Sequence, residues 1–131
     1  MYDATEIVQN LWMGSVPSKS EDVKPFDVII NLFGQFLDPS KLSVIWIFQD
    51  EEHLPDLNML MALARSIHQF RSEGKNVLVH CQAGRNRSGL VVGTALAYDG
   101  FSGSAAVKRI KGTRGPEALS NDVFRSFVEN L

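Results

Sequence analysis

The residue with the clearest chemical potential is Cys81, the only cysteine of the chain. It lies in residues 77–89, which read Val-Leu-Val-His-Cys-Gln-Ala-Gly-Arg-Asn-Arg-Ser-Gly. An apolar strand that enters a glycine-containing loop and then a helix forms a good anion site. Its backbone N–H groups converge, and the helix N-terminus adds about half a positive charge. Arg87 brings a guanidinium that can bind two oxygens of the same anion. The predicted phosphate-binding residues are Gln82, Ala83, Gly84, Arg85, Asn86 and Arg87.

This setting favours the charged form of the Cys81 thiol, since thiols in such positive surroundings have pKa values of ~3.5–7.5. A thiolate that faces a phosphate monoester is a nucleophile directed at phosphorus. The expected product is a cysteinyl-phosphate, which water must then hydrolyse. Ser88 follows the arginine, and its hydroxyl is expected to hydrogen-bond the sulfur and help it leave in the second step.

The apolar patterns predict the elements that position these residues. Strands are expected within residues 5–14, as a strand or hairpin, and over 26–32, 44–48 and 77–79, with a loop at 15–25. Helices are expected over residues 57–70, 87–100, 102–112 and 121–131. Alternating strands and helices predict an α/β fold with a mainly parallel sheet. Gly89 and Gly93, four residues apart, are expected to let their helix pack closely on that sheet.

Length and charge limit the alternatives. The 131 residues fit one domain, which we place at 1–131. A net charge of −2 argues against a general nucleic-acid or polybasic membrane binder, and no apolar run approaches the ~18 residues of a membrane helix. A single cysteine allows no intramolecular disulfide, and residues 1–6 lack the features of a signal peptide. We therefore expect a cytoplasmic monomer.

The segment His80-Cys81, five further residues, then Arg87-Ser88 resembles the signature of cysteine-dependent protein phosphatases. The Ala83-Gly84 and Ser88-Gly89 pairs resemble its dual-specificity subgroup. Similarity extends to residues 10–15, 26–32 and 114–121 and to Phe124. The resemblance implies a protein tyrosine phosphatase-like fold: a mainly parallel sheet of four to five strands, flanked by helices on both faces. It also implies hydrolysis of phosphotyrosine and phosphoserine or phosphothreonine in proteins, without a metal or cofactor.

The resemblance also suggests a proton donor for the leaving oxygen. Asp50 follows a predicted strand and lies where the family carries its acid loop, so it is the candidate general acid. Glu51, Glu52 and Asp56 are rivals because they are close in sequence, and Asp56 also suits a helix cap. His53 is a further possible donor.

Three other residues have roles suggested by the family or by their place in the loop. His80 is expected to order the loop by hydrogen bonds rather than to react. Arg85 occupies a variable loop position and either influences substrate choice or is simply solvated. Arg114 precedes the last helix, where related phosphatases place a loop beside the pocket. We expect it near a second phosphate or acidic substrate residues.

Other functions use the same features. A phosphoinositide or RNA 5′-phosphate phosphatase would need the same cradle and nucleophile. A phospho-binding module would bind without turnover, which the full set of Cys81, Arg87 and Asp50 argues against. A sulfur-transfer or arsenate-reducing enzyme would also use an oxyanion cradle, but arsenate reduction usually needs further cysteines, which this chain lacks.

Overall fold

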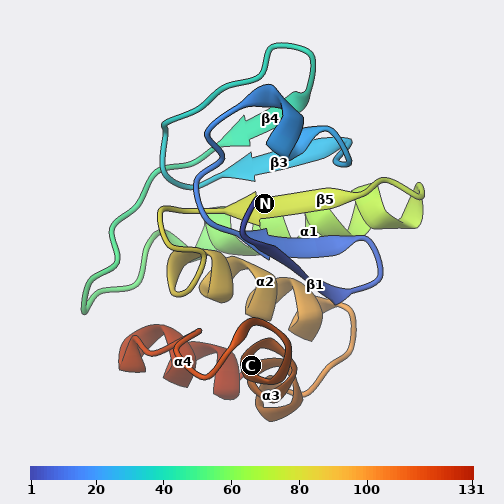
Figure 1. Ribbon diagram of the computed structural model, residues 1–131. Helices are drawn as coiled ribbons and strands as arrows, with labels where there is room; N and C mark the ends of the chain where they lie inside the picture. The colour runs from blue at the N-terminus through green and yellow to red at the C-terminus, as the bar shows by residue number, and fades with distance from the viewer.

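The computed structural model describes residues 1–131 and is built on a five-stranded sheet of order β1-β2-β5-β3-β4 (Figure 1). Only the β1–β2 pair is antiparallel, so the expected mainly parallel sheet is confirmed. The central strand, β5, pairs in parallel with β2 on one side and β3 on the other. The strands are β1 (Ala4–Val8), β2 (Leu11–Gly14), β3 (Val28–Asn31), β4 (Leu42–Ile45) and β5 (Val77–His80).

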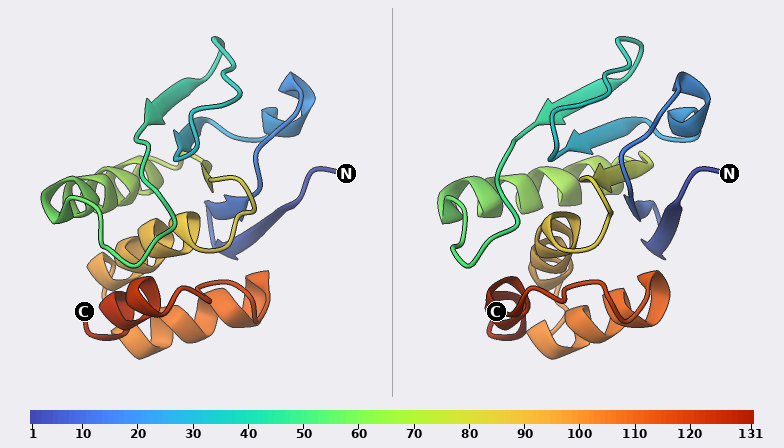
Figure 2. Two further views of the ribbon diagram at one scale, coloured as in Figure 1. Left: turned by 90° about the vertical axis from the view of Figure 1, so that its left-hand side faces the viewer. Right: turned by 60° about the vertical axis from the view of Figure 1, so that its left-hand side comes forward.

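Four α-helices pack on one face of this sheet, where the main hydrophobic core lies. Figure 2 shows α1 and α2 next to the sheet, with α3 and α4 packed beneath α2. Strand side chains alternate between faces, so residues such as Val77 and Val79 reach this core. The helices are α1 (Leu57–Ser72), α2 (Arg87–Tyr98), α3 (Gly103–Arg114) and α4 (Asp122–Glu129).

The opposite face carries no α-helix. Trp12, Ile29 and Leu78 point to this side and pack against Val23 and Phe26. A 3-10 helix, η1 (Ser20–Val23), covers part of this face. Helices were expected on both faces of the sheet, and on this face the only one is this single turn. The connection from β2 to β3 contains Pro17 and Pro25, which do not favour the interior of an α-helix, and its one helical element is η1.

Most predicted boundaries differ from the observed ones by one or two residues, and the differences at β4 and α3 have a clear structural cause. β4 covers Leu42–Ile45 rather than residues 44–48, because its only partner, β3, ends at Asn31. The Asn31 side chain accepts hydrogen bonds from the next backbone N–H groups and turns the chain there. α3 continues to Arg114 rather than stopping at Gly112, and Gly115, with φ +132°, ends it.

The ends of α1 follow the predicted signals. The Asp56 carboxylate accepts hydrogen bonds from the N–H groups of Asn58 and Met59 at 2.9 and 3.1 Å. Gly74, with φ +79°, follows the last turn. None of the helices combines the length and the apolar character that crossing a membrane requires.

Gly89 and Gly93 of α2 were expected to face the sheet, but they face other parts of the chain. A Cβ atom at Gly89 would lie 2.9 Å from the Leu119 side chain, and one at Gly93 would lie 2.8 Å from Val128. The prediction that they pack on the sheet is therefore wrong. They bring α2 close to α4 and to the segment that precedes it, because that side of α2 carries the second helical layer.

We expect Gly93→Ala to destabilise the protein by ~1–3 kcal/mol, because the added methyl group overpacks the α2–α4 contact. Gly112→Ala is the matched control, since nothing lies within 4 Å of a Cβ there. Its higher helix propensity should stabilise by up to about 1 kcal/mol. Urea unfolding measures both, and equal effects would contradict the close approach at Gly93.

Candidate active site

Cys81 lies at the carboxyl end of β5, the central parallel strand, where α/β sheets commonly bind ligands. The residue is 2% exposed, and its loop leads directly into α2, which begins at Arg87. In Figure 1 the parallel strands end together at the side of the molecule where this loop turns. The sulfur therefore lies below a helix N-terminus, as the motif predicted.

The loop surrounds the sulfur with hydrogen-bond donors. Burial raises the pKa of the Cys81 thiol, but Ser88 and the backbone N–H groups of Ser88, Arg85 and Gly84 outweigh it and hold the pKa below its ordinary value. The Ser88 Oγ atom lies 3.5 Å from the sulfur. These groups favour the thiolate form of Cys81 over that of an ordinary cysteine, and the same N–H groups can also hold phosphoryl oxygens.

Backbone contacts from two sides hold this loop in shape. The Val16 N–H donates to the Gln82 carbonyl at 3.0 Å, and the Leu119 N–H donates to the Arg85 carbonyl at 3.1 Å. Gly84 has φ +70°, and a Cβ atom there would lie 2.5 Å from the Gly14 carbonyl carbon. Only glycine meets both the conformation and the close approach.

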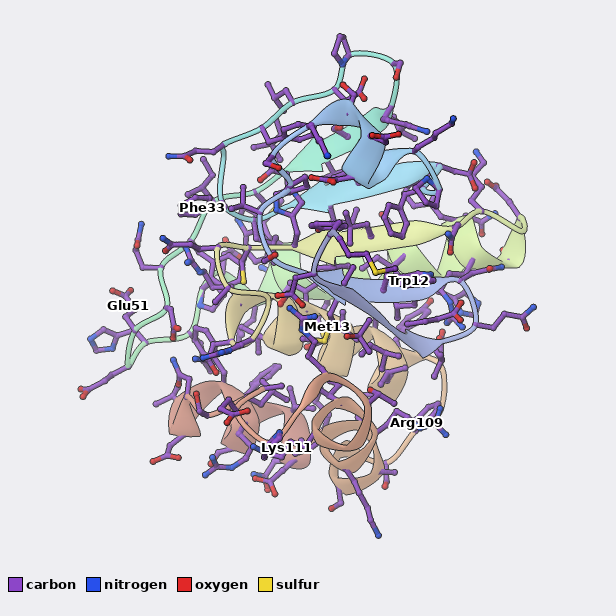
Figure 3. All side chains as sticks on the ribbon, viewed as in Figure 1. Trp12, Met13, Phe33, Glu51, Arg109 and Lys111 are labelled. Carbon is purple, nitrogen blue, oxygen red and sulfur yellow. The ribbon has the colours of Figure 1, made fainter.

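Arg87 is held by two residues that the motif does not contain. Its guanidinium donates to the Phe48 carbonyl at 3.5 Å, and its Cζ atom lies 5.4 Å from the centre of the Phe33 ring. Figure 3 shows Phe33 on the side of the molecule where β5 ends. Sequence reasoning missed both contacts, since each pairs the arginine with a distant segment.

Two side-chain amides hold Asp50 at the edge of the loop of residues 81–87, called the phosphate loop here because residues 82–87 are predicted to bind phosphate. Asn86 Nδ2 donates to one carboxylate oxygen at 3.0 Å, and Asn121 Nδ2 donates to the other at 2.8 Å. Asn121 also donates to the Glu51 carbonyl at 2.9 Å, while its own oxygen accepts from the Val123 and Phe124 N–H groups and caps α4.

Asn121 was predicted only as the start of a helix, so its contact with Asp50 is a role that sequence reasoning missed. The side-chain oxygen of Asn121 caps its own helix, which is a local contact. Its side-chain nitrogen donates to a residue 71 positions away, and no local pattern indicates that contact. Asn86, predicted to bind phosphate, uses its side chain for Asp50 and Ser120.

The other candidate proton donors near Asp50 occupy different positions from it. Both hydrogen bonds from the first turn of α1 end on one oxygen of Asp56, which fixes that carboxylate at the helix start. Glu51, Glu52 and His53 are exposed on the connecting loop. Figure 3 shows Glu51 on the outer part of this loop. Asp50 is the acid of this group that contacts the phosphate loop.

His80 precedes the nucleophile and is fully buried. Its Nδ1 atom lies 3.4 Å from the Cys81 carbonyl oxygen, and its Nε2 atom has no partner. Burial lowers the pKa of His80 to about 4, so the ring is neutral at physiological pH. The ordering role of His80 stays a prediction.

Arg114 and Arg85 flank the loop from the outside. The Arg114 side chain is 7% exposed and contacts Asp3, Thr5 and two carbonyl groups of the loop. Arg85 is exposed, and its carbonyl is used by Leu119. Contact of either side chain with substrate stays a prediction.

The sequence of this chain matches the family model described as dual specificity phosphatase, catalytic domain, over residues 11–129. The chain belongs to this family. The predicted resemblance to the dual-specificity subgroup is therefore confirmed.

Named relatives agree with this membership. The chain is 35% identical to tyrosine-protein phosphatase MSG5 of Saccharomyces cerevisiae over 112 residues, which cover 79% of this chain and 23% of that protein. It is 37% identical to putative tyrosine phosphatase 123R of Invertebrate iridescent virus 6 over 92 residues, which cover 69% and 64%. The chain thus spans about a quarter of the yeast relative and just under two thirds of the viral one.

Solved structures share the dual-specificity phosphatase fold. A mouse putative dual specificity phosphatase has a TM-score of 0.85 at 20% identity, covering 98% of this chain and 86% of that one. Human DUSP28 has a TM-score of 0.82 at 22% identity, covering 96% and 90%. These likenesses confirm the α/β architecture of the dual-specificity phosphatase domain.

We expect Ser88→Ala to raise the pKa of Cys81, because it removes the hydroxyl that stabilises the sulfur and leaves the loop backbone in place. The pH dependence of iodoacetamide alkylation measures this, since Cys81 is the only thiol. The midpoint should move up relative to the wild type. An unchanged midpoint would remove Ser88 from the stabilisation of the thiolate.

Proposed function

We propose that this chain is a phosphomonoester hydrolase that removes phosphate from phosphotyrosine and from phosphoserine or phosphothreonine in proteins, through a cysteinyl-phosphate. The observation that carries the proposal is the environment of Cys81. A buried thiol with a lowered pKa lies among the N–H groups of Gly84, Arg85 and Ser88. Family membership supports the same chemistry.

In the first step, the Cys81 thiolate attacks phosphorus and the bond between phosphorus and the leaving oxygen breaks. Asp50 gives its proton to that oxygen, which departs as an alcohol or phenol. The loop N–H groups and the Arg87 guanidinium bind the phosphoryl oxygens as charge develops on them. The product is a phosphate ester of the cysteine sulfur.

In the second step, water attacks the phosphorus and the phosphorus–sulfur bond breaks. The Asp50 carboxylate accepts a proton from this water, which restores the acid. The Ser88 hydroxyl donates a hydrogen bond to the departing sulfur, so that it leaves as a stabilised thiolate. No redox or metal step is required in this sequence of bonds.

Charge around the site favours phosphopeptides over polyanionic substrates. The hollow beside Asn86 is lined by the carboxylates of Asp50, Glu51, Glu52 and Asp122. These negative groups would repel a polyphosphorylated headgroup or an RNA backbone. Lipid substrates remain the second candidate, because one relative is named a phosphatidylinositol trisphosphate 3-phosphatase and one structural neighbour was solved with PI(5)P.

The proposal includes a cytoplasmic, monomeric enzyme. A free nucleophilic cysteine is best preserved in a compartment that keeps thiols reduced, which supports this location. Neither a nucleic-acid partner nor a membrane partner is expected from a net charge of −2.

Cys81→Ser should abolish phosphate release from para-nitrophenyl phosphate while phosphopeptide binding is retained. The variant keeps the loop and loses the nucleophile. Malachite-green detection of phosphate measures turnover, and calorimetry with a phosphotyrosine peptide measures binding. A wild-type protein that binds the peptide and releases no phosphate would instead show a binding module. A panel that includes phosphothreonine, phosphoinositide and 5′-triphosphorylated RNA distinguishes the substrate classes.

Asp50→Asn should slow hydrolysis by roughly 10²-fold or more for a poor leaving group such as an alkyl phosphate. A good leaving group such as para-nitrophenol should be affected much less, because it departs without a proton. Asp56→Asn is the matched control, since asparagine caps a helix as well as aspartate does. Comparison of kcat for the two substrates decides the assignment. Selective loss in the Asp56 variant would transfer the acid role to that residue.

A further inference from the structure

Arg114 is the last residue of α3 and was predicted to lie near the substrate. It also makes several polar contacts to the phosphate loop, which that role does not require. Its Nε atom donates to the Gly84 carbonyl at 2.9 Å, and one terminal nitrogen donates to the Ala83 carbonyl at 3.2 Å. Both terminal nitrogens bind the Asp3 carboxylate, at 2.7 and 3.0 Å. A further hydrogen bond reaches Thr5 Oγ1 at 3.1 Å. The guanidinium is thus fully engaged.

The geometry of the peptide bond connects these contacts to the sulfur. In a trans peptide the C=O and the N–H point in opposite directions. The Ala83 carbonyl belongs to the same peptide unit as the Gly84 N–H, and the Gly84 carbonyl to the same unit as the Arg85 N–H. Holding both carbonyl oxygens on the outside therefore directs both N–H groups inward, to the side where Cys81 lies.

We propose that Arg114 is a positioning residue: it fixes two peptide groups of the phosphate loop from outside, so that their N–H groups face the sulfur and the phosphoryl oxygens. Asp3 fixes the guanidinium in turn. The proposal rests on the proposed function, in which Cys81 is the nucleophile. The two N–H groups concerned are among those that lower the pKa of Cys81.

The packing at Gly84 supports a fixed arrangement. A Cβ atom there would lie 2.5 Å from an Arg114 terminal nitrogen and 2.6 Å from the Gly14 carbonyl oxygen. The loop is therefore confined between α3 on one side and the end of β2 on the other. A loop confined in this way needs little rearrangement when charge develops on the bound group.

The titratable groups near Cys81 keep the same charge over the pH range in which its thiol titrates. His80 has a pKa of about 4 and stays neutral over the range of a thiol titration. Burial raises the pKa of Tyr2 far above this range, although Arg114 opposes the shift. Arg85, Arg87 and Arg114 carry charges that do not change over this range. Asp3, the partner of Arg114, directly precedes β1.

The test is the pH dependence of Cys81 alkylation by iodoacetamide, followed by intact-mass measurement. Arg114→Met keeps much of the side-chain volume and removes every donor. We expect its midpoint to rise by roughly one pH unit as the two N–H groups lose their alignment. Arg109→Met is the matched control. Arg109 lies on the same helix and reaches only the Ile7 carbonyl and the Phe101 ring. Figure 3 shows it on the side away from Phe33 and Glu51.

Two further variants separate positioning from charge and from folding. Arg114→Lys keeps the charge but cannot bind both carbonyls and Asp3 in one plane, so its midpoint should also rise. A lysine midpoint equal to that of the wild type would show that charge alone acts and would overturn the proposal. Asp3→Ala leaves the guanidinium in place but unfixed, and its exposed position makes it safe for folding. It should give a smaller rise.

A shift of less than about 0.2 pH unit in Arg114→Met would also overturn the proposal. If that variant unfolds in a thermal melt, Asp3→Ala decides, and an unshifted midpoint there has the same meaning. Alkylation needs no turnover, so these results stand apart from the proposed function. Wild-type protein that alkylates as expected but releases no phosphate would reject the phosphatase activity and leave the positioning role intact.

Discussion

The site depends on keeping a negative sulfur stable inside an apolar interior. Cys81 is part of the main hydrophobic core and is almost completely buried. Burial alone would favour the neutral thiol, which is a poor nucleophile. The Ser88 hydroxyl and the backbone N–H groups of Ser88, Arg85 and Gly84 outweigh this effect and lower the pKa of the thiol. The positive φ of Gly84 and the loop contacts follow from the need to direct several N–H groups at one atom.

Segments far apart in the chain meet around this loop, and each contributes a specific contact. The connection after β4 supplies Asp50, the start of α4 supplies Asn121, and the end of α3 supplies Arg114. Asn121 serves two purposes, since the same side chain caps α4 and binds the Asp50 carboxylate. Stability of the last helix and placement of the candidate acid are therefore coupled through one residue.

A site formed by backbone groups and an apolar core are both compatible with a fold that is shared at low sequence identity. Solved structures share the architecture at 20–22% identity, with TM-scores of 0.82–0.85. A site formed by backbone N–H groups does not depend on the type of most loop side chains. Gln82, Ala83 and Arg85 are exposed here. A core tolerates many apolar substitutions of similar volume.

The sequence by itself determined the local parts of this protein: the strands and helices to within a few residues, and the loop that joins Cys81 to Arg87. Hydrophobic periodicity, capping signals and a short motif are all properties of neighbouring residues. Only the tertiary structure decided which distant groups meet. Asp50 and Asn121 are 71 positions apart, and Asp3 and Arg114 are 111 apart. The end of β4 and the cover of the second sheet face were decided in the same way, because they depend on partners that spacing along the chain does not reveal.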